Sequence, residues 1–282
     1  MSHAARPVTG GLLDAIRASV STALQWRRSQ TPLDVVARAA ERRSPDGRRF
    51  RAALAREGGA NIIAECKRRS PARGVLARTY EPAAIARGYA RAGAAAVSVL
   101  TEPTFFDGAL AHLEAVRTAV SLPLLRKDFV LDEYQIYESR AAGADAVLLI
   151  AAMLDDAALR RLSRCAEALG LAALVEVHSK PELDTAAAAG ADIIGVNSRD
   201  LRTLAVDLRV CDALIAAAPA GVVMVAESGI RSRQDIDRLA RAGYRAHLIG
   251  ERLMTEPDPG AALAALLGPA EASAAARPAG EC

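Results

Sequence analysis

The stretch PLLRKDFVLDEYQIYESRAAGADAVLLI, residues 123–150, decides the fold. It begins and ends with short apolar runs, residues 123–128 and 146–150, which are typical of fully buried parallel strands. Between them lie a polar turn and a helical stretch that ends at Gly143, because glycine tolerates the left-handed conformation that follows a helix. The stretch therefore predicts one strand–helix–strand unit.

The same unit recurs along the chain. Eight apolar runs follow one another at intervals of roughly 20 to 35 residues. They span residues 62–66, 95–100, 123–128, 146–150, 172–177, 193–197, 222–228 and 246–250. The glycine joint is repeated in RAGAAAVSVL, AAGADAVLLI, AAGADIIGVN and RAGYRAHLIG. Such repetition predicts an α/β fold, a (β/α)8 or TIM barrel; the alternative is an open doubly wound sheet, whose strands reorder at a switch point.

Helical periodicity also precedes the first strand. We expect helices within residues 12–28, 31–43 and 45–57, with Thr31 as the N-cap of the second and Pro32 as its first residue. Residues 1–60 are thus predicted to form an N-terminal helical extension that covers one barrel end or encloses the site. We expect residues 61–268 to form the catalytic barrel and residues 269–282, which are rich in Ala, Pro and Gly, to be a disordered tail.

Composition narrows the possible partners. The 282 residues include 36 basic and 33 acidic side chains, and the arginines are scattered, so neither nucleic acid nor a membrane is expected as a partner. No apolar run approaches the roughly 18 residues of a membrane span. The widely spaced cysteines favour a reducing, cytoplasmic setting. They are Cys66, Cys165, Cys211 and Cys282.

Polar residues stand at the ends of seven predicted strands, where a barrel builds its active site. They are Glu65, Lys67, Thr101, Glu102, Lys127, Asp128, Glu176, His178, Asn197, Arg199, Glu227, Ser228, Gly250 and Glu251. Strand alternation places Glu65 and Lys67 on one face, and Glu176 and His178 on one face. Cys66 points the other way, toward the outer helices.

The glutamates that continue buried strands must be neutral, paired with cations, or exposed in a cleft, because an unpaired buried charge costs several kcal/mol in practice. Lys67 and Lys127 are the expected cations, and a partly desolvated lysine near other cations is expected to have a lowered pKa. The alternative is that each pair is a structural salt bridge. Two lysines and three glutamates at one barrel end favour an active site.

Two loops indicate a phosphate site. SGIRS (228–232) follows the seventh strand and IGERL (249–253) the eighth, and barrels frequently bind phosphate there through backbone N–H groups. Ser228, Gly229, Gly250 and Glu251 are the expected donors. The loop RRSPARG (68–74) adds Ser70 and further cations. Ordinary tight turns are the alternative for the single glycines.

Six segments resemble the indole-3-glycerol phosphate synthase family and together cover about residues 60–265 in the family's order. They are IIAECKRRSPARG, SVLTEPTFFDG, PLLRKDFVLDEYQIYESRAAGADAVLLI, LVEVHSKPEL, IIGVNSRDLRTLAVDL and VAESGIRSRQDIDRLARAG. The resemblance implies a small phosphorylated substrate, 1-(2-carboxyphenylamino)-1-deoxyribulose 5-phosphate. It also implies ring closure with loss of carbon dioxide and water, and neither cofactor nor metal. We expect a monomer or weak homodimer.

The resemblance also implies roles for single residues. Lys127 is the general acid, Glu176 its basic or electrostatic partner, and Lys67 a cation for the substrate carboxylate, the phosphate or a second acid step. The remaining expected catalytic residues are Glu65, Asn197 and Glu227. The expected substrate-binding residues are Ser70, Phe129, Leu148, Arg199, Ser228 and Leu248, and those for phosphate are Lys67, Ser228, Gly229, Gly250 and Glu251.

The chain departs from the family pattern at two positions, and two other functions stay open. Ser198 stands where the family usually has a second Asn, and His247, expected to be a buried and hydrogen-bonded imidazole, stands where an aromatic residue is common. Another phosphosugar isomerase or epimerase would share the fold, but we expect it to use a Cys/Asp or Glu/His pair. A non-catalytic phosphosugar-binding protein would have lost Lys127 or Glu176.

Overall fold

The computed structural model describes residues 11–268, and its centre is a closed barrel of eight parallel strands. The barrel strands are β1 (Asn61–Cys66), β4 (Ala96–Leu100), β5 (Leu124–Lys127), β6 (Ala146–Ile150), β7 (Ala172–Val177), β8 (Ile193–Asn197), β9 (Val223–Glu227) and β10 (Ala246–Ile249). Because β1 pairs with both β4 and β10, the sheet has no open edge. The predicted barrel is confirmed and the doubly wound alternative is wrong.

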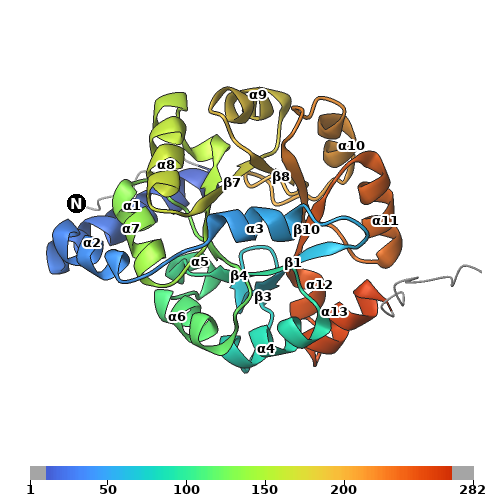
Figure 1. The fold of residues 1–282 in the computed structure, drawn as a ribbon, viewed down its shortest axis with the longest axis horizontal. Helices are drawn as coiled ribbons and strands as arrows, with labels where there is room; N and C mark the ends of the chain where they lie inside the picture. Colours follow the sequence, from blue (N-terminus) through green and yellow to red (C-terminus); the bar gives the residue numbers. More distant parts are fainter. Residues whose placement is uncertain (1–10, 269–282) are drawn as a thin grey trace, which may run out of the picture.

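Each predicted apolar run corresponds to one strand, and the bounds differ by at most one residue at either end. Helices alternate with the strands and surround the barrel (Figure 1). They are α4 (Pro82–Ala92), α5 (Pro103–Phe106), α6 (Leu110–Ala119), α7 (Glu133–Ala141), η1 (Ala151–Met153), α8 (Asp156–Ala168), α9 (Lys180–Ala188), α10 (Arg209–Ile215), α11 (Arg233–Ala242), α12 (Glu251–Met254) and α13 (Pro259–Leu267). A two-stranded hairpin, β2 (Arg69–Ser70) and β3 (Gly74–Val75), forms in the loop after β1.

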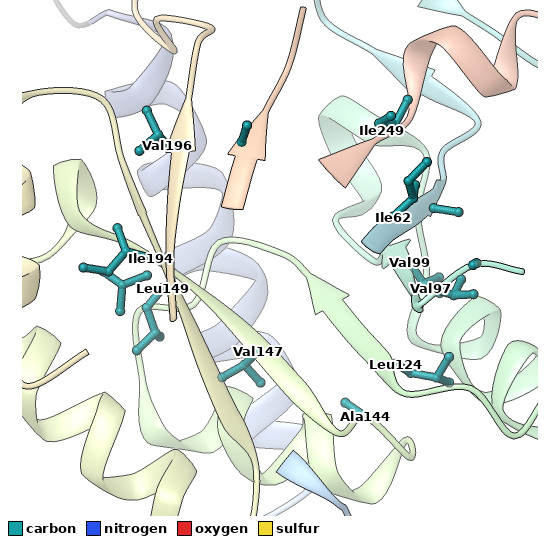
Figure 2. Packing of buried hydrophobic residues seen from close by; sticks show 14 of the residues in the cluster. Ile62, Val97, Val99, Leu124, Ala144, Val147, Leu149, Ile194, Val196 and Ile249 are labelled. Carbon is teal, nitrogen blue, oxygen red and sulfur yellow. The ribbon is translucent and has the colours of Figure 1, made fainter. Parts of the chain in front are cut away.

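Alternation along the strands separates two apolar clusters. Outward side chains such as Ile62, Val147 and Ile194 pack between the strands and the helices (Figure 2). Inward side chains such as Ile63 and Leu125 fill the barrel interior. Cys66 belongs to the outer cluster, as predicted. Side chains that point inward near the C-terminal ends of the strands therefore face the barrel mouth.

The N-terminal helices cover both ends of the barrel. They are α1 (Leu12–Gln30), α2 (Leu33–Glu41) and α3 (Gly47–Leu54). α3 crosses the N-terminal end and buries Phe50 and Leu54 in the interior cluster (Figure 1). Gly47 permits this approach, since a Cβ there would lie 2.4 Å from the backbone nitrogen of Ala172.

The predicted cap of the second helix is wrong by one residue. Pro32 is the N-cap of α2, whereas Thr31 ends α1 and donates its N–H to the carbonyl of Arg27. The predicted disordered tail, residues 269–282, lies outside the described residues, as do residues 1–10. Among the described helices, none is both long and apolar enough to span a membrane.

His247 is buried as predicted, but it is not hydrogen-bonded. Its side chain is 1% exposed, and neither ring nitrogen has a hydrogen-bond partner within residues 11–268. The backbone of Ile236 lies nearby but outside hydrogen-bond geometry. Burial lowers the pKa of His247 to about 4. The folded chain thus holds a neutral imidazole under conditions in which the unfolded chain protonates it.

This residue should make stability sensitive to acid. The unfolded His binds a proton as pH falls below about 6.5, while the folded one resists until about pH 4, so stability is lost across this interval. Between pH 7 and pH 5 we expect the wild type to lose about 2 kcal/mol more unfolding free energy than His247→Phe. Urea unfolding at both pH values measures this difference, and equal losses would contradict the prediction.

Candidate active site

A cavity of about 410 Å³ opens at the C-terminal ends of the strands, and every barrel strand or the loop after it contributes to its lining. All residues predicted for the site line this cavity. They are Glu65, Lys67, Ser70, Lys127, Phe129, Leu148, Glu176, Asn197, Arg199, Glu227, Ser228, Gly229, Leu248, Gly250 and Glu251. The volume falls within the range of small-molecule sites, roughly 300–1,000 Å³.

Lys127 stands opposite two glutamates at the bottom of the cavity. Its Nζ lies 3.4 Å from Oε2 of Glu176 and 3.6 Å from Oε2 of Glu227. Burial lowers the pKa of Lys127, but the carboxylates of Glu176, Glu227 and Glu65 outweigh burial and raise it. The expectation of a lowered lysine pKa is therefore wrong for Lys127, because its nearest charged neighbours are anions and not cations.

Lys67 and Glu65 form the second ion pair. The Nζ of Lys67 donates to Oε1 of Glu65 at 2.5 Å, which confirms that the two side chains share a face. Burial raises the pKa of Glu65, but Lys67, Lys127 and Arg199 outweigh this effect and lower it overall. Glu65 is therefore an anion, and its charge is balanced by the cations around it.

Glu227 differs from Glu65 and Glu176 because its carboxyl group accepts no hydrogen bond within residues 11–268. It is 1% exposed, and neither of its oxygens has a hydrogen-bond partner in the part of the chain that the structure describes. Burial above all, assisted by the neighbouring Glu176 and opposed by Lys127, raises the pKa of Glu227 to about 8. Glu227 consequently keeps its proton near neutral pH, and two carboxylates remain to oppose two ammonium groups.

Asn197 orients Glu176. Its Nδ2 donates to Oε1 of Glu176 at 3.0 Å, while its Oδ1 accepts the backbone N–H of Arg199 at 3.0 Å. His178 does not join them in the cavity lining: its ring contacts the carbonyl oxygen of Asn197 at 2.7 Å. Lys67 and His178 each directly follow the last residue of their strand, and the alternation rule holds for Lys67 but fails for His178, whose ring turns to the backbone of Asn197.

The predicted phosphate residues gather at one side of the cavity. Ser228 and Gly229 are consecutive left-handed residues, with φ of 64° and 78°, a conformation that is uncommon for a non-glycine residue and is often found at functional sites. The carboxylate of Glu251 bridges two cations, lying 3.1 Å from Arg199 and 3.2 Å from Arg73. The cavity is therefore cationic around these backbone turns.

Several residues of the cavity lining were not predicted from the sequence. The cations Arg73, Arg231 and Arg252 were not singled out, although each lies in or beside a loop that was predicted to bind phosphate. Leu12 and Ile16 of α1 also line the cavity, and no sequence pattern tells which barrel end a preceding helix covers.

These α1 residues complete an apolar wall with Phe129, Leu148 and Leu248, and the ring centroid of Phe106 is 6.0 Å from that of Phe129. The N-terminal helices thus help enclose the site. Within the described residues, no group of three or more His, Cys, Asp or Glu side chains is placed to hold a metal ion.

Hydrogen bonds of the buried Arg126 hold the end of β5 that carries Lys127. Arg126 is 1% exposed and donates to Thr101 at 3.0 Å, to Asp128 at 2.8 Å and to the carbonyl of Gln135 at 2.9 Å. The carboxylate of Asp128 also accepts the N–H of Phe129 at 2.8 Å. Thr101 and Asp128, which were predicted at the barrel mouth from the sequence, therefore accept the hydrogen bonds of Arg126 and help to fix this strand end.

Comparison with known proteins gives one consistent family. The family model described as indole-3-glycerol phosphate synthase matches residues 13–266. An indole-3-glycerol phosphate synthase of Carboxydothermus hydrogenoformans is 52% identical over 77% of this chain and 84% of its own length. One of a Nocardioides species is 50% identical over 91% of this chain and 98% of its own length.

Solved structures of other phosphosugar enzymes share the fold at low identity. 3-Hexulose-6-phosphate synthase of Salmonella typhimurium has a TM-score of 0.58 at 14% identity and covers 73% of this chain and 98% of its own. N-acetylmannosamine-6-phosphate 2-epimerase of Clostridium perfringens has a TM-score of 0.54 at 13% identity and covers 68% and 86%. These likenesses show the fold alone, whereas the family model and the relatives at about 50% identity show that the chain belongs to the indole-3-glycerol phosphate synthase family.

Proposed function

We propose that the chain converts 1-(2-carboxyphenylamino)-1-deoxyribulose 5-phosphate to indole-3-glycerol phosphate, carbon dioxide and water, as a carboxy-lyase of tryptophan biosynthesis. One observation carries the assignment of roles: the ammonium of Lys127 lies between Glu176 and Glu227, in a cavity with an apolar wall and a cationic phosphate side. The substrate has matching parts, namely an aryl ring, a phosphate and a ketone between them.

The cavity orients this substrate. The phosphate lies against the backbone N–H groups of Ser228, Gly229, Gly250 and Glu251, where free amides and helix N-termini favour anions. The aryl ring lies against the apolar wall formed with Phe129, and its carboxylate faces a cation, for which Lys67 is available. Holding both ends brings the ring carbon against the ketone, so the reaction proceeds as an intramolecular step.

Lys127 then acts as the general acid. As the ring carbon that bears the carboxylate attacks the ketone, the ketone oxygen takes a proton from the ammonium of Lys127. The new carbon–carbon bond disrupts the aromatic ring, and loss of carbon dioxide returns the electron pair and restores it. Glu176, held by Asn197, stabilises the ammonium beforehand and accepts a proton afterwards.

Dehydration completes the reaction. The hydroxyl formed from the ketone leaves as water with a proton from an acid, and the adjacent carbon loses a proton to a base, which forms the indole double bond. The Lys67–Glu65 pair, linked at 2.5 Å, supplies a second acid and base beside the first pair. The same proposal covers a catalytic barrel of residues 61–268 with its extension, residues 1–60, acting in the cytoplasm as a monomer or weak homodimer.

The alternative functions fit the site less well. An isomerase or epimerase that shuttles a proton needs one acid–base pair. Here two lysine–glutamate pairs, formed by Lys67 and Lys127, converge on one cavity. A non-catalytic binding protein has no use for a buried ammonium held by two buried glutamates, since such groups are costly to desolvate.

The direct test is a turnover assay. The purified chain is mixed with the synthetic carboxyphenylamino substrate, and the fluorescence of the indole product is followed with time. Product should form without added cofactor. Absence of product with folded protein would overturn the proposed function.

The proton on Glu227 should be visible in the pH dependence of turnover. When Glu227 ionises above about pH 8, a second anion strengthens the hold of Lys127 on its proton and makes it a weaker acid, so kcat should fall. In Glu227→Gln, which mimics the neutral carboxyl group, this alkaline limb should disappear while kcat at pH 7 stays within about tenfold. An unchanged alkaline limb in the variant would contradict the role. Glu176→Gln, in contrast, should lose activity at every pH.

A further inference from the structure

Gly195 and Gly250 occupy inward positions near the barrel mouth. Gly195 lies in the middle of β8, between the outward-facing Ile194 and Val196, and its register neighbours are Glu176 on β7 and Val225 on β9. Gly250 directly follows β10 and has a φ of −124°, while Gly195 is part of a regular strand. Neither glycine has the positive φ that favours this residue type, so a left-handed backbone does not explain them.

Space explains them. A Cβ added at Gly195 would lie 2.0 Å from Oε1 of Glu227, and one added at Gly250 would lie 2.1 Å from Oε1 of Glu65. Each carboxyl group therefore rests against the backbone of a glycine on the adjacent strand, at a distance that no other residue type permits. A glycine inside a strand usually weakens it, and close approach of another group is a common reason for its presence.

We propose that Gly195 is a positioning residue for Glu227, and that its missing side chain lets the carboxyl group lie beside Glu176 and Lys127. The proposal rests on the function proposed above. With a methyl group at this position, the carboxyl oxygen of Glu227 would have to move by at least about 1.4 Å before an ordinary contact, which begins at about 3.4 Å, is restored. It would then leave its place 3.6 Å from the Nζ of Lys127 and enter the space of the substrate.

Gly250 stands in the same relation to Glu65. The sequence predicted Gly250 as a backbone donor to phosphate, and its neighbour in space adds a second reason for glycine. Both glutamates belong to strands that adjoin the strand of their glycine, β9 beside β8 and β1 beside β10. At two places in the site, a carboxyl group thus lies against a glycine that stands in or directly after the neighbouring strand, where no side chain takes up the space.

Gly195→Ala tests the proposal. A displacement of about 1 Å near the reacting groups can cost about 100-fold, so we expect kcat to fall by at least about 100-fold and KM to rise, because the carboxyl group enters the space of the substrate. The alkaline limb of the pH profile should also shift, since Glu227 would lose its contact with Lys127. Gly59→Ala is the matched control, because nothing lies within 4 Å of a Cβ there, and its kcat should be unchanged.

A double-variant cycle identifies the residue that is displaced. Glu227→Asp shortens the side chain and withdraws it from the added methyl group, so G195A/E227D should be more active and melt higher than the sum of the single effects predicts. The coupling of the melting temperatures needs no turnover, so it stands even if the proposed function fails. Strictly additive effects, or a kcat of Gly195→Ala within about threefold of wild type, would overturn the proposal.

The proposal remains testable if Gly195→Ala does not fold. In that case G195A/E227A removes the carboxyl group that the new methyl would meet. Folding of this double variant supports the proposal, because it identifies the carboxyl group as the obstacle. Failure of both variants to fold overturns it, since another neighbour, such as Leu174 at 3.4 Å, would then require the space.

Discussion

Lys127→Met is expected to lower kcat by about 10²- to 10⁴-fold, the usual contribution of a positioned general acid. Methionine approximates the length of the lysine side chain but carries no proton to donate to the ketone oxygen. KM should change much less than kcat, because the phosphate and the aryl ring are bound elsewhere in the cavity. Steady-state kinetics with the carboxyphenylamino substrate measures both quantities.

Two further variants make this experiment specific. Lys127→Arg keeps the positive charge but is a far weaker acid with a planar head group, so it should not restore turnover. The chain has only one lysine besides Lys67 and Lys127, namely Lys180, which is half exposed and pairs with Asp184 on the surface. Lys180→Met is the matched control and should be fully active. Normal activity in Lys127→Met would contradict the proposed mechanism.

Arg126→Met should cause a large loss of stability, about 3–5 kcal/mol, which is typical when one partner of a buried ion pair is removed. The side chains of Arg126 and Asp128 are 2% and 7% exposed, and their closest atoms are 2.8 Å apart. Without the guanidinium group, the buried carboxylate of Asp128 loses its cation and keeps only neutral donors, the hydroxyl of Thr101 and the N–H of Phe129. Urea unfolding gives the change in free energy.

An exposed pair of the same kind supplies the control. Arg209 and Asp207 are also two residues apart, at 2.7 Å, but Arg209 is 88% exposed. Arg209→Met should therefore change stability by less than about 1 kcal/mol. Adding Asp128→Asn to Arg126→Met should recover part of the loss, since the stranded charge is removed. Equal losses for Arg126→Met and Arg209→Met would contradict the role of the anchor.

The barrel was predictable from the sequence because each strand is buried on both faces. Such strands form apolar runs of a few residues that glycine joints separate, as in residues 146–150 after Gly143. Periodicity could not decide the helix start at Thr31, since a Thr–Pro pair can occupy the cap and first position or the two positions before the helix. The structure uses the latter.

The composition of the site was predictable for a similar reason. All strands of a parallel barrel end at one edge, so residues at the C-terminal ends of different strands, such as Lys127 and Glu176, meet although they are distant in sequence. Alternation also predicted that Glu65 and Lys67 share a face. It misplaced His178, whose ring contacts the carbonyl oxygen of Asn197 on the neighbouring strand, a tertiary contact that the alternation pattern does not contain.

The sequence alone determined which strands carry the catalytic side chains of the barrel mouth, because strand periodicity and chain order are local properties. Only the tertiary structure decided which of them touch. Closure of the barrel sets Lys127 between two glutamates and raises its pKa, and it buries Glu227 and raises the pKa of its carboxyl group, while packing of α1 adds Leu12 and Ile16 to the cavity lining. The tertiary structure also shows that Gly195 leaves room for the carboxyl group of Glu227, which its backbone conformation does not explain. These properties depend on distances between strands that no local pattern encodes.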